Sequence, residues 1–298
     1  MHSNIHFSRW NHIQDSTWPL KVYKQYNEEL SQLIWAESFA HQFTYKHLAT
    51  IATSWEDAPN KFFKIPPHNN NFETIKDWSN GYEELQNWIH LNCIMAMSAY
   101  LETYLDSVIT LAIESDPGVL LNAPHHIDGT ILLKNEKLKV DDVKERVTNC
   151  TKGTWTSRCN AFSSIFGAIP SSLKDKISLL DQIRLLRNKV GHAFGRDIEQ
   201  SRSIDINKIK PAERVSQKRV LKYLRELYGV VKGVDAFLLN NHIGEYQAIL
   251  AYHKLYPSLN KNIHINLRAD MFKKNYGKND VAIGKTFCRE LAQYYESI

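Results

Sequence analysis

Apolar residues recur every three or four positions along most of the chain, which is the spacing of one face of an α-helix. The long stretches between turn signals follow this helical period and not the two-residue alternation of a half-buried strand. Only 12 glycines and 9 prolines interrupt them. The pattern therefore predicts an all-α fold built around long helices.

Breaks in this pattern divide the chain into three parts. A helical region at about 21–55 is followed by a linker at 58–71, which contains three prolines and three consecutive asparagines. We therefore assign 1–71 to an N-terminal helical extension and linker, 72–240 to a helical domain, and 241–298 to a C-terminal helical extension.

The helical domain opens with a long predicted helix at about 82–115. Asn80 and Glu83 resemble a capping box at its start, and Leu101, Leu105, Val108 and Ala112 form one apolar stripe. Shorter helices are predicted at 140–150 and 155–166, and a further one at 212–240. Ser172 and Asp175 predict the start of another helix that continues to Gly191, with its apolar stripe at Leu173, Ile177, Leu180, Ile183, Leu186 and Val190.

Composition narrows the class of protein without deciding its function. Hydrophobic residues make up 43% and charged residues 23%, as in ordinary folded proteins. The longest apolar stretch, 93–101, is much shorter than the ~18 residues of a membrane span, and no signal peptide is evident, so we expect a cytoplasmic protein without membrane contact. Four cysteines without CxxC spacing predict reduced, buried thiols. A net charge of +5 permits a nucleic-acid partner but does not require one.

The segment richest in chemistry lies at the end of the predicted 172–191 helix. It contains Arg187, Asn188 and His192. Cleavage of a phosphodiester needs a group that transfers protons and a cation where charge builds on phosphorus, and His192 and Arg187 are suited to these roles. On a straight helix the two side chains would point about 140° apart. We therefore expect Gly191 to end the helix in a left-handed conformation and to turn His192 toward Arg187.

This motif resembles the signature of the HEPN superfamily, in which an Arg, an Asn, three further residues and a His close an amphipathic helix. The segment 97–105 is similar to the family's first long helix, with Glu102 among apolar residues. The resemblance covers about 82–240. It implies a helical bundle with additional terminal helices, and a metal-independent endoribonuclease of a bacterial antiviral defence or toxin-antitoxin system.

The resemblance also implies a mechanism and partners. The substrate's own 2′-hydroxyl would attack, no cofactor or metal would take part, and two protomers would pair their motifs in one composite cleft. RNA, a second copy of the chain and an antitoxin or other regulatory protein are the expected partners. Phe194 stands where toxins controlled by a nucleotidyltransferase antitoxin carry a modified Tyr, so we do not expect control by that route.

The candidate residues fall into two groups. Arg187 and His192 are the expected catalytic pair, Asn188 would hold the imidazole or touch the phosphate, and Glu102 is an additional candidate. Arg184, Lys189 and Arg196 would contact the RNA backbone near the motif. A basic stripe on the 212–240 helix could contribute, and it consists of Arg214, Lys218, Lys222 and Arg225.

Several alternatives stay open. The chain could be a non-catalytic module of the same fold that binds RNA or a protein. Arg187 and Asn188 could also be a polar helix end, with His192 as a capping residue that the helix dipole favours. His125, His126 and Asp128 suggest a metal site, but no second cluster with ligand spacing accompanies them, so we predict none. Gly284 to Thr286 resembles the end of a P-loop, but the glycine required five positions earlier is Asn279.

Overall fold

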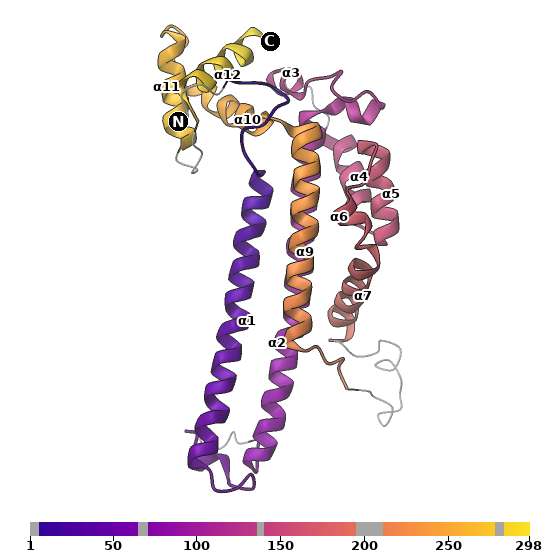
Figure 1. Ribbon diagram of the computed structural model, residues 1–298, viewed down its shortest axis with the longest axis vertical. Coiled ribbons are helices and arrows are strands. Elements are labelled where there is room, and N and C mark those ends of the chain that lie inside the picture. The colour runs from indigo at the N-terminus through magenta and orange to yellow at the C-terminus, as the bar shows by residue number, and fades with distance from the viewer. Residues whose placement is uncertain (1–5, 65–70, 136–139, 195–210, 278–282) are drawn as a thin grey trace. The chain divides into compact units, whose positions relative to one another are not determined.

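The computed structural model describes residues 6–64, 71–135, 140–194, 211–277 and 283–298. Within these ranges every regular element is helical, which confirms the predicted all-α fold (Figure 1). The chain divides into two compact units. Unit 1 comprises Met1–Tyr23, Leu101–Ser178 and Gly229–Ile298, and unit 2 comprises Lys24–Tyr100 and Leu179–Tyr228. The divisions between them fall inside helices and not at the linker near residue 71.

The longer α-helices are α1 (Trp18–Ile51), α2 (Ile75–Ser115), α7 (Ile177–Ala193) and α9 (Gln217–Leu238). The shorter ones are α3 (Gly129–Lys134), α4 (Val140–Thr151), α5 (Trp155–Phe166), α6 (Ser171–Lys174), α10 (Tyr246–Leu255), α11 (Ile265–Tyr276) and α12 (Lys285–Ser297). Brief 3₁₀ turns occur at Pro59–Lys61, Pro117–Leu121 and Tyr256–Ser258, and a π-helical turn at Leu239–Ile243. No helix in the described ranges has both the length and the apolar run needed to cross a bilayer.

The start of α2 differs from the prediction. The helix begins at Ile75, because Thr74 and Asp77 form a reciprocal capping pair in which each backbone N–H donates to the other side chain, both at 3.1 Å. The predicted start at Asn80 and Glu83 is therefore wrong. Gly81 lies inside the helix, where a Cβ atom would come within 2.7 Å of the Phe72 ring, so the missing side chain makes room for that ring.

The predicted 172–191 helix is also interrupted. It forms α6 and α7, separated by a tight turn in which the Lys176 N–H donates to the Leu173 carbonyl at 3.1 Å. Its apolar stripe is nevertheless buried at Leu180, Ile183, Leu186 and Val190, and half-buried at Ile177. The stripe predicted on α2 is buried throughout, and α9 buries a stripe of its own at Val220, Leu224, Leu227, Val231 and Val234.

In unit 2, α1 and α2 form an antiparallel hairpin joined by aromatic contacts (Figure 1). Tyr26 of α1 contacts Tyr100 of α2 with ring centroids 5.0 Å apart, and His41 stacks on Tyr82 at the same distance. Further along, Tyr45 of α1 packs on Tyr82 at 6.0 Å. Pairs of this kind add to the free energy gained from burial alone, so they hold the two long helices in register.

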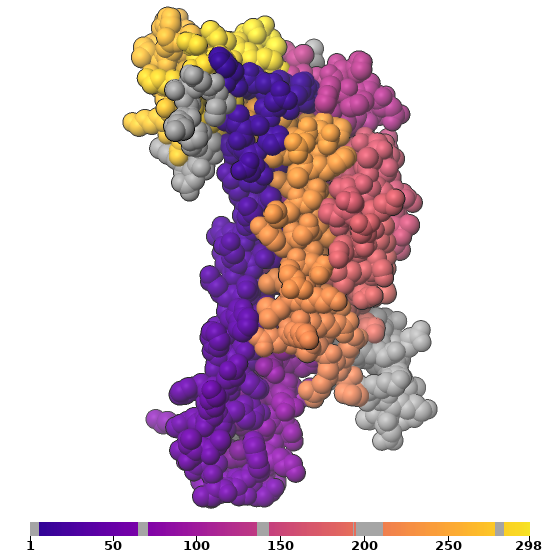
Figure 2. Space-filling view, in the orientation of Figure 1, coloured from indigo at the N-terminus to yellow at the C-terminus, as the bar shows by residue number. Residues whose placement is uncertain are grey.

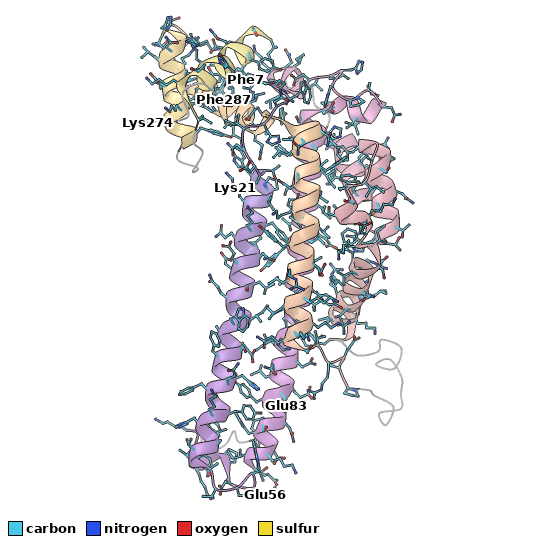
Figure 3. All side chains as sticks on the ribbon, viewed as in Figure 1. Phe7, Lys21, Glu56, Glu83, Lys274 and Phe287 are labelled. Carbon is cyan, nitrogen blue, oxygen red and sulfur yellow. The ribbon has the colours of Figure 1, made fainter. Side chains whose placement is uncertain are left out.

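In unit 1, the two ends of the chain share one core. The rings of Tyr252 and Phe272 meet edge to face at 5.3 Å within the α10, α11 and α12 cluster. Phe7 packs against Phe287 of α12 at 5.6 Å, a pair labelled in Figure 3. Figure 2 shows the N-terminal segment (indigo) lying against these C-terminal helices (yellow). The first 23 residues of the N-terminal extension assigned from sequence therefore belong to the same unit as the C-terminal extension, whereas its remainder belongs to unit 2.

All four cysteines are buried and none forms a disulfide, as predicted. Burial raises the pKa of the Cys93 thiol to about 11 and those of Cys150 and Cys288 to about 12. These thiols stay protonated at neutral pH and are poor nucleophiles.

A buried carboxylate on α9 organises the polar interior of unit 1. Asp235, 1% exposed, accepts hydrogen bonds from the backbone N–H of Thr17 at 3.1 Å, from the Thr17 hydroxyl, and from the Tyr104 hydroxyl at 3.2 Å. It thereby connects the start of α1, the middle of α2 and α9 within the unit. Burial and the Asp235 charge hold the pKa of Tyr104 well above its ordinary value, so Tyr104 remains a donor.

Asp235→Ala should destabilise the protein by about 3 kcal/mol, because it leaves the buried N–H and hydroxyl of Thr17 without their acceptor, whereas the Tyr104 hydroxyl retains the Val231 carbonyl at 3.2 Å. Asp106→Ala, at an exposed position of α2, should change stability by less than about 0.5 kcal/mol. Chemical denaturation of the two variants measures the difference. Equal unfolding midpoints would show that Asp235 does not organise this interior.

Candidate functional site

The Arg187–His192 motif lies at the C-terminal end of α7, in unit 2. The helix passes through Gly191 without interruption, and Gly191 is not among the glycines with positive φ. Instead the chain turns at Phe194, whose φ is 50° and whose N–H donates to the Val190 carbonyl at 2.9 Å. The Phe194 ring stacks on Trp88 of α2 at 5.7 Å, and this packing offsets the cost of a left-handed non-glycine residue.

The predicted turn at Gly191 is therefore wrong, and the helix does not turn His192 toward Arg187. Arg187 and His192 lie on one continuous helix, about 7.5 Å apart along its axis and about 140° apart around it. A single copy of α7 consequently directs the two side chains away from each other. His192 is exposed and Arg187 is half-buried.

Asn188 is oriented toward the arginine. Its Oδ1 accepts a hydrogen bond from Arg187 Nη1 at 3.3 Å, so this amide oxygen positions the guanidinium and not the imidazole. Of the predicted RNA contacts, Arg184 forms an ion pair with Asp181 at 2.7 Å and Lys189 with Glu213 at 3.1 Å. Arg196 lies outside the described residues.

One exposed stripe of α7 carries His192. It consists of Gln182, Leu185, Lys189 and His192, spaced by three, four and three residues, and we call it the motif face. Leu185 is 53% exposed, whereas Leu180, Ile183, Leu186 and Val190 of the same helix are buried. The motif face therefore places one apolar side chain beside His192.

Glu102 lies on the part of α2 that belongs to unit 1, whereas the motif belongs to unit 2. Its carboxylate forms an ion pair at 3.5 Å with Arg158, which is buried and stacks over the Trp155 ring at 4.6 Å. The Arg158 Nε also donates to the Gly153 carbonyl at 3.1 Å. Glu102 therefore has a structural role in compensating a buried guanidinium.

A groove between α1 and α9 in unit 2 combines positive charge with an aromatic side chain. Its lining residues are Trp35, Gln217, Lys218, Leu221, Lys222 and Arg225. Trp35 is 42% exposed, and in Figure 2 this part of α9 (orange) lies beside α1. Three of the four residues in the predicted basic stripe thus share one groove, whereas Arg214 precedes α9 and pairs with Glu84.

A polar pocket in unit 2 was not predicted from the sequence. His41 of α1, His90 of α2 and Gln217 of α9 line it. Each has one buried side-chain atom without a hydrogen-bond partner among the described residues: His41 Nδ1, His90 Nε2 and Gln217 Nε2. Buried polar atoms of this kind are normally satisfied by water or a ligand. No local motif indicates the pocket, because its residues come from three distant segments.

Sequence analysis also missed the partners of His125 in unit 1. Asp116, His125 and His242 have ligating atoms that all lie within 4.8 Å of one another. The sequence predicts no metal site at His125 because no second cluster with ligand spacing accompanies it, whereas the structure brings Asp116 and the distant His242 beside it. Neighbouring His126 is not part of this group, and its Nδ1 contacts the Pro124 carbonyl at 3.1 Å.

No known protein family matches the chain, and no curated protein or solved structure shows significant similarity to it.

Gly191→Ala should stabilise the protein by about 0.5–1 kcal/mol, since Gly191 is helical and the new Cβ would lie 3.7 Å from Met95 Cε, an ordinary contact. Gly167→Ala should instead destabilise it by about 1 kcal/mol. Gly167 ends α5 with φ 76°, a conformation that is strained for alanine, although a new Cβ would contact no neighbouring atom. Thermal unfolding of both variants tests the helix end. If Gly191→Ala destabilised the protein as much as Gly167→Ala, the result would support the left-handed turn predicted from the sequence and contradict the continuous helix.

Proposed function

We propose that this chain is a metal-independent endoribonuclease whose cleavage site is built from Arg187 and His192. The observation that carries the proposal is the motif face, which presents His192 to solvent at the end of the helix that also carries Arg187. The resemblance of this motif to the HEPN signature adds the reaction class. A role in bacterial defence or a toxin-antitoxin system, with an inhibitory protein partner, is part of the same proposal.

The proposed reaction is transesterification followed by release of the leaving strand. The 2′-hydroxyl attacks the adjacent phosphorus, the bond from phosphorus to the 5′-oxygen breaks, and the products are a 2′,3′-cyclic phosphate and a 5′-hydroxyl. His192 transfers protons at these oxygens, and the Arg187 guanidinium stabilises the negative charge that builds on the phosphoryl oxygens. Asn188 orients that guanidinium through its 3.3 Å hydrogen bond.

The reaction calls for two proton-transfer groups and one chain supplies a single His192, which favours a shared site. Two copies of α7 that pair through the motif face would bring two histidines together, one to remove a proton and one to donate it. Leu185 is exposed on that face and would be covered by such pairing. Two-fold pairing of one surface with itself is the commonest arrangement in soluble oligomers.

The groove formed by Trp35 and the cations of α9 supports RNA as the substrate class. Lys218, Lys222 and Arg225 would contact phosphates, and a base would stack on the exposed Trp35 ring. The groove and the motif both lie within unit 2.

Purified protein should cleave RNA and leave 2′,3′-cyclic phosphate ends, and Arg187→Ala or His192→Ala should lower the rate at saturating RNA by at least about 100-fold. Cleavage should persist with chelator added to the assay, because the proposed chemistry uses a guanidinium as its cation. Fragment analysis with end mapping is the measurement.

Lys222→Ala is the matched control for that experiment. It removes an exposed cation of the groove that is not part of the motif face, so RNA affinity and its salt dependence should fall while the rate at saturation is retained. Activity that requires added magnesium or manganese, or efficient cutting at a 2′-deoxy position, would contradict the mechanism. RNA binding without fragments would favour the non-catalytic module.

Leu185→Glu should convert a dimer into a monomer and abolish cleavage, because it places like charges where the two motif faces meet. Leu121→Glu, at a leucine of unit 1 that is 68% exposed, is the matched control and should change neither mass nor activity. Mixing Arg187→Ala with His192→Ala protein should restore part of the activity. Light scattering that shows an active wild-type monomer would exclude the shared site.

A further inference from the structure

Three side chains from distant segments of unit 1 converge on one point. Asp116 follows the end of α2, His125 lies in the loop after the 3₁₀ turn Pro117–Leu121, and His242 lies in the π-helical turn after α9. The Asp116 Oδ2 atom is 2.9 Å from His242 Nδ1 and 3.6 Å from His125 Nε2. Asp116 and His242 are buried, and the side chain of His125 is 46% exposed.

Two local irregularities of the backbone create this convergence. His125 has φ 65°, a left-handed conformation that is uncommon for residues other than glycine. His242 is presented by the π-helical turn Leu239–Ile243, a type of turn that occurs frequently at functional sites. Both backbone conformations cost free energy, and strained conformations of this kind are commonest at functional sites, where they position side chains.

The surrounding contacts hold all three side chains in place. The His125 N–H donates to Asp116 Oδ1 at 2.8 Å, which leaves Oδ2 for the two imidazoles. Trp10 stacks on the His125 ring at 4.2 Å, and Phe166 contacts the His242 ring at 5.0 Å. The hydroxyl of Ser115 donates to the His242 carbonyl at 2.7 Å and fixes the turn that carries it.

We propose that Asp116, His125 and His242 bind one divalent transition-metal ion of the zinc type. In a tetrahedral site with bonds of about 2.0–2.1 Å, neighbouring ligand atoms lie about 3.3 Å apart. The 2.9 and 3.6 Å separations bracket that value. Two imidazoles and one carboxylate suit Zn²⁺, whereas Mg²⁺ and Ca²⁺ prefer oxygen ligands alone.

Metal binding requires both histidines to be neutral, with the ligating nitrogen free of hydrogen. His125 Nε2 and His242 Nδ1 bind the ion without a hydrogen, so each ring carries its hydrogen on its other nitrogen. His125 Nε2 donates a hydrogen bond to the Asn241 carbonyl at 2.6 Å, and binding of the ion replaces this bond as the ring's hydrogen moves to Nδ1. The exposed side of His125 provides the route by which the ion enters.

The ion would join three segments of unit 1, so its main effect is on stability. Binding to the folded state alone raises the unfolding temperature in proportion to the logarithm of free metal. The site belongs to unit 1 and the proposed nuclease motif to unit 2, so metal content and thermal stability report on it without reference to RNA cleavage.

The test is to strip the full-length protein with chelator, titrate it with Zn²⁺, and measure bound metal and unfolding temperature. We expect one Zn²⁺ per chain, a rise in unfolding temperature, and, with Co²⁺ as the probe, the intense visible absorption of a tetrahedral site. Absence of stoichiometric binding in the wild type would overturn the proposal and leave the three residues as a hydrogen-bonded cluster.

His125→Asn is the decisive variant, because asparagine tolerates the left-handed conformation and the fold should be retained. It should weaken Zn²⁺ binding at least tenfold and remove the thermal shift. His126→Asn, one residue further along the same exposed loop, should leave both unchanged. Asp116→Asn should also weaken binding. Equal Zn²⁺ affinity in the wild type and His125→Asn would refute the site.

Discussion

The structure of unit 1 depends on the buried guanidinium of Arg9. It is 7% exposed and donates to the Ser115 carbonyl at 2.8 Å, to the Ile243 carbonyl at 3.0 Å and to the Asp128 carboxylate at 2.9 Å. A buried cation without such partners would cost several kcal/mol, so the end of α2, the π-helical turn and the start of α3 must meet around it. Gly244 permits this approach, since a Cβ atom there would lie 2.4 Å from the Arg9 carbonyl oxygen.

This constraint explains why irregular backbone gathers in one place. The carbonyls that Arg9 engages belong to the residues that flank Asp116 and His242, so the same guanidinium sets the distance between those two side chains. Burial opposes ionisation of Asp128, but the Arg9 charge and hydrogen bonds from Tyr294 and Thr130 lower its pKa overall, so the pair remains charged. The candidate metal site is thus supported by a rigid polar framework, which positions ligands more accurately than a flexible loop would.

Unit 2 presents its candidate chemistry in a different way. Arg187, Lys189 and His192 come from one regular helix, so their relative directions follow from helical geometry alone. Such an arrangement can expose a histidine and cations over an extended face, but one helix cannot direct Arg187 and His192 at the same phosphate. Under the proposed function, pairing of two chains through the motif face would supply a second histidine, and the exposed Leu185 would be covered by that contact.

Local signals in the sequence determined the helical content and the buried faces. The limits of α5 were predicted correctly because Thr154 caps its start and Gly167 its end, and both act within a few residues. At the end of α7, tertiary packing determines where the helix stops. The helix continues through Gly191 to Ala193, because the Phe194 ring packs on Trp88 of α2. The clustering of Asp116 with His242, 126 residues away, could not be predicted from spacing, because it depends on how distant helix ends close around Arg9. Sequence periodicity determines which residues face inward along one helix, whereas only tertiary contacts decide which helix ends meet.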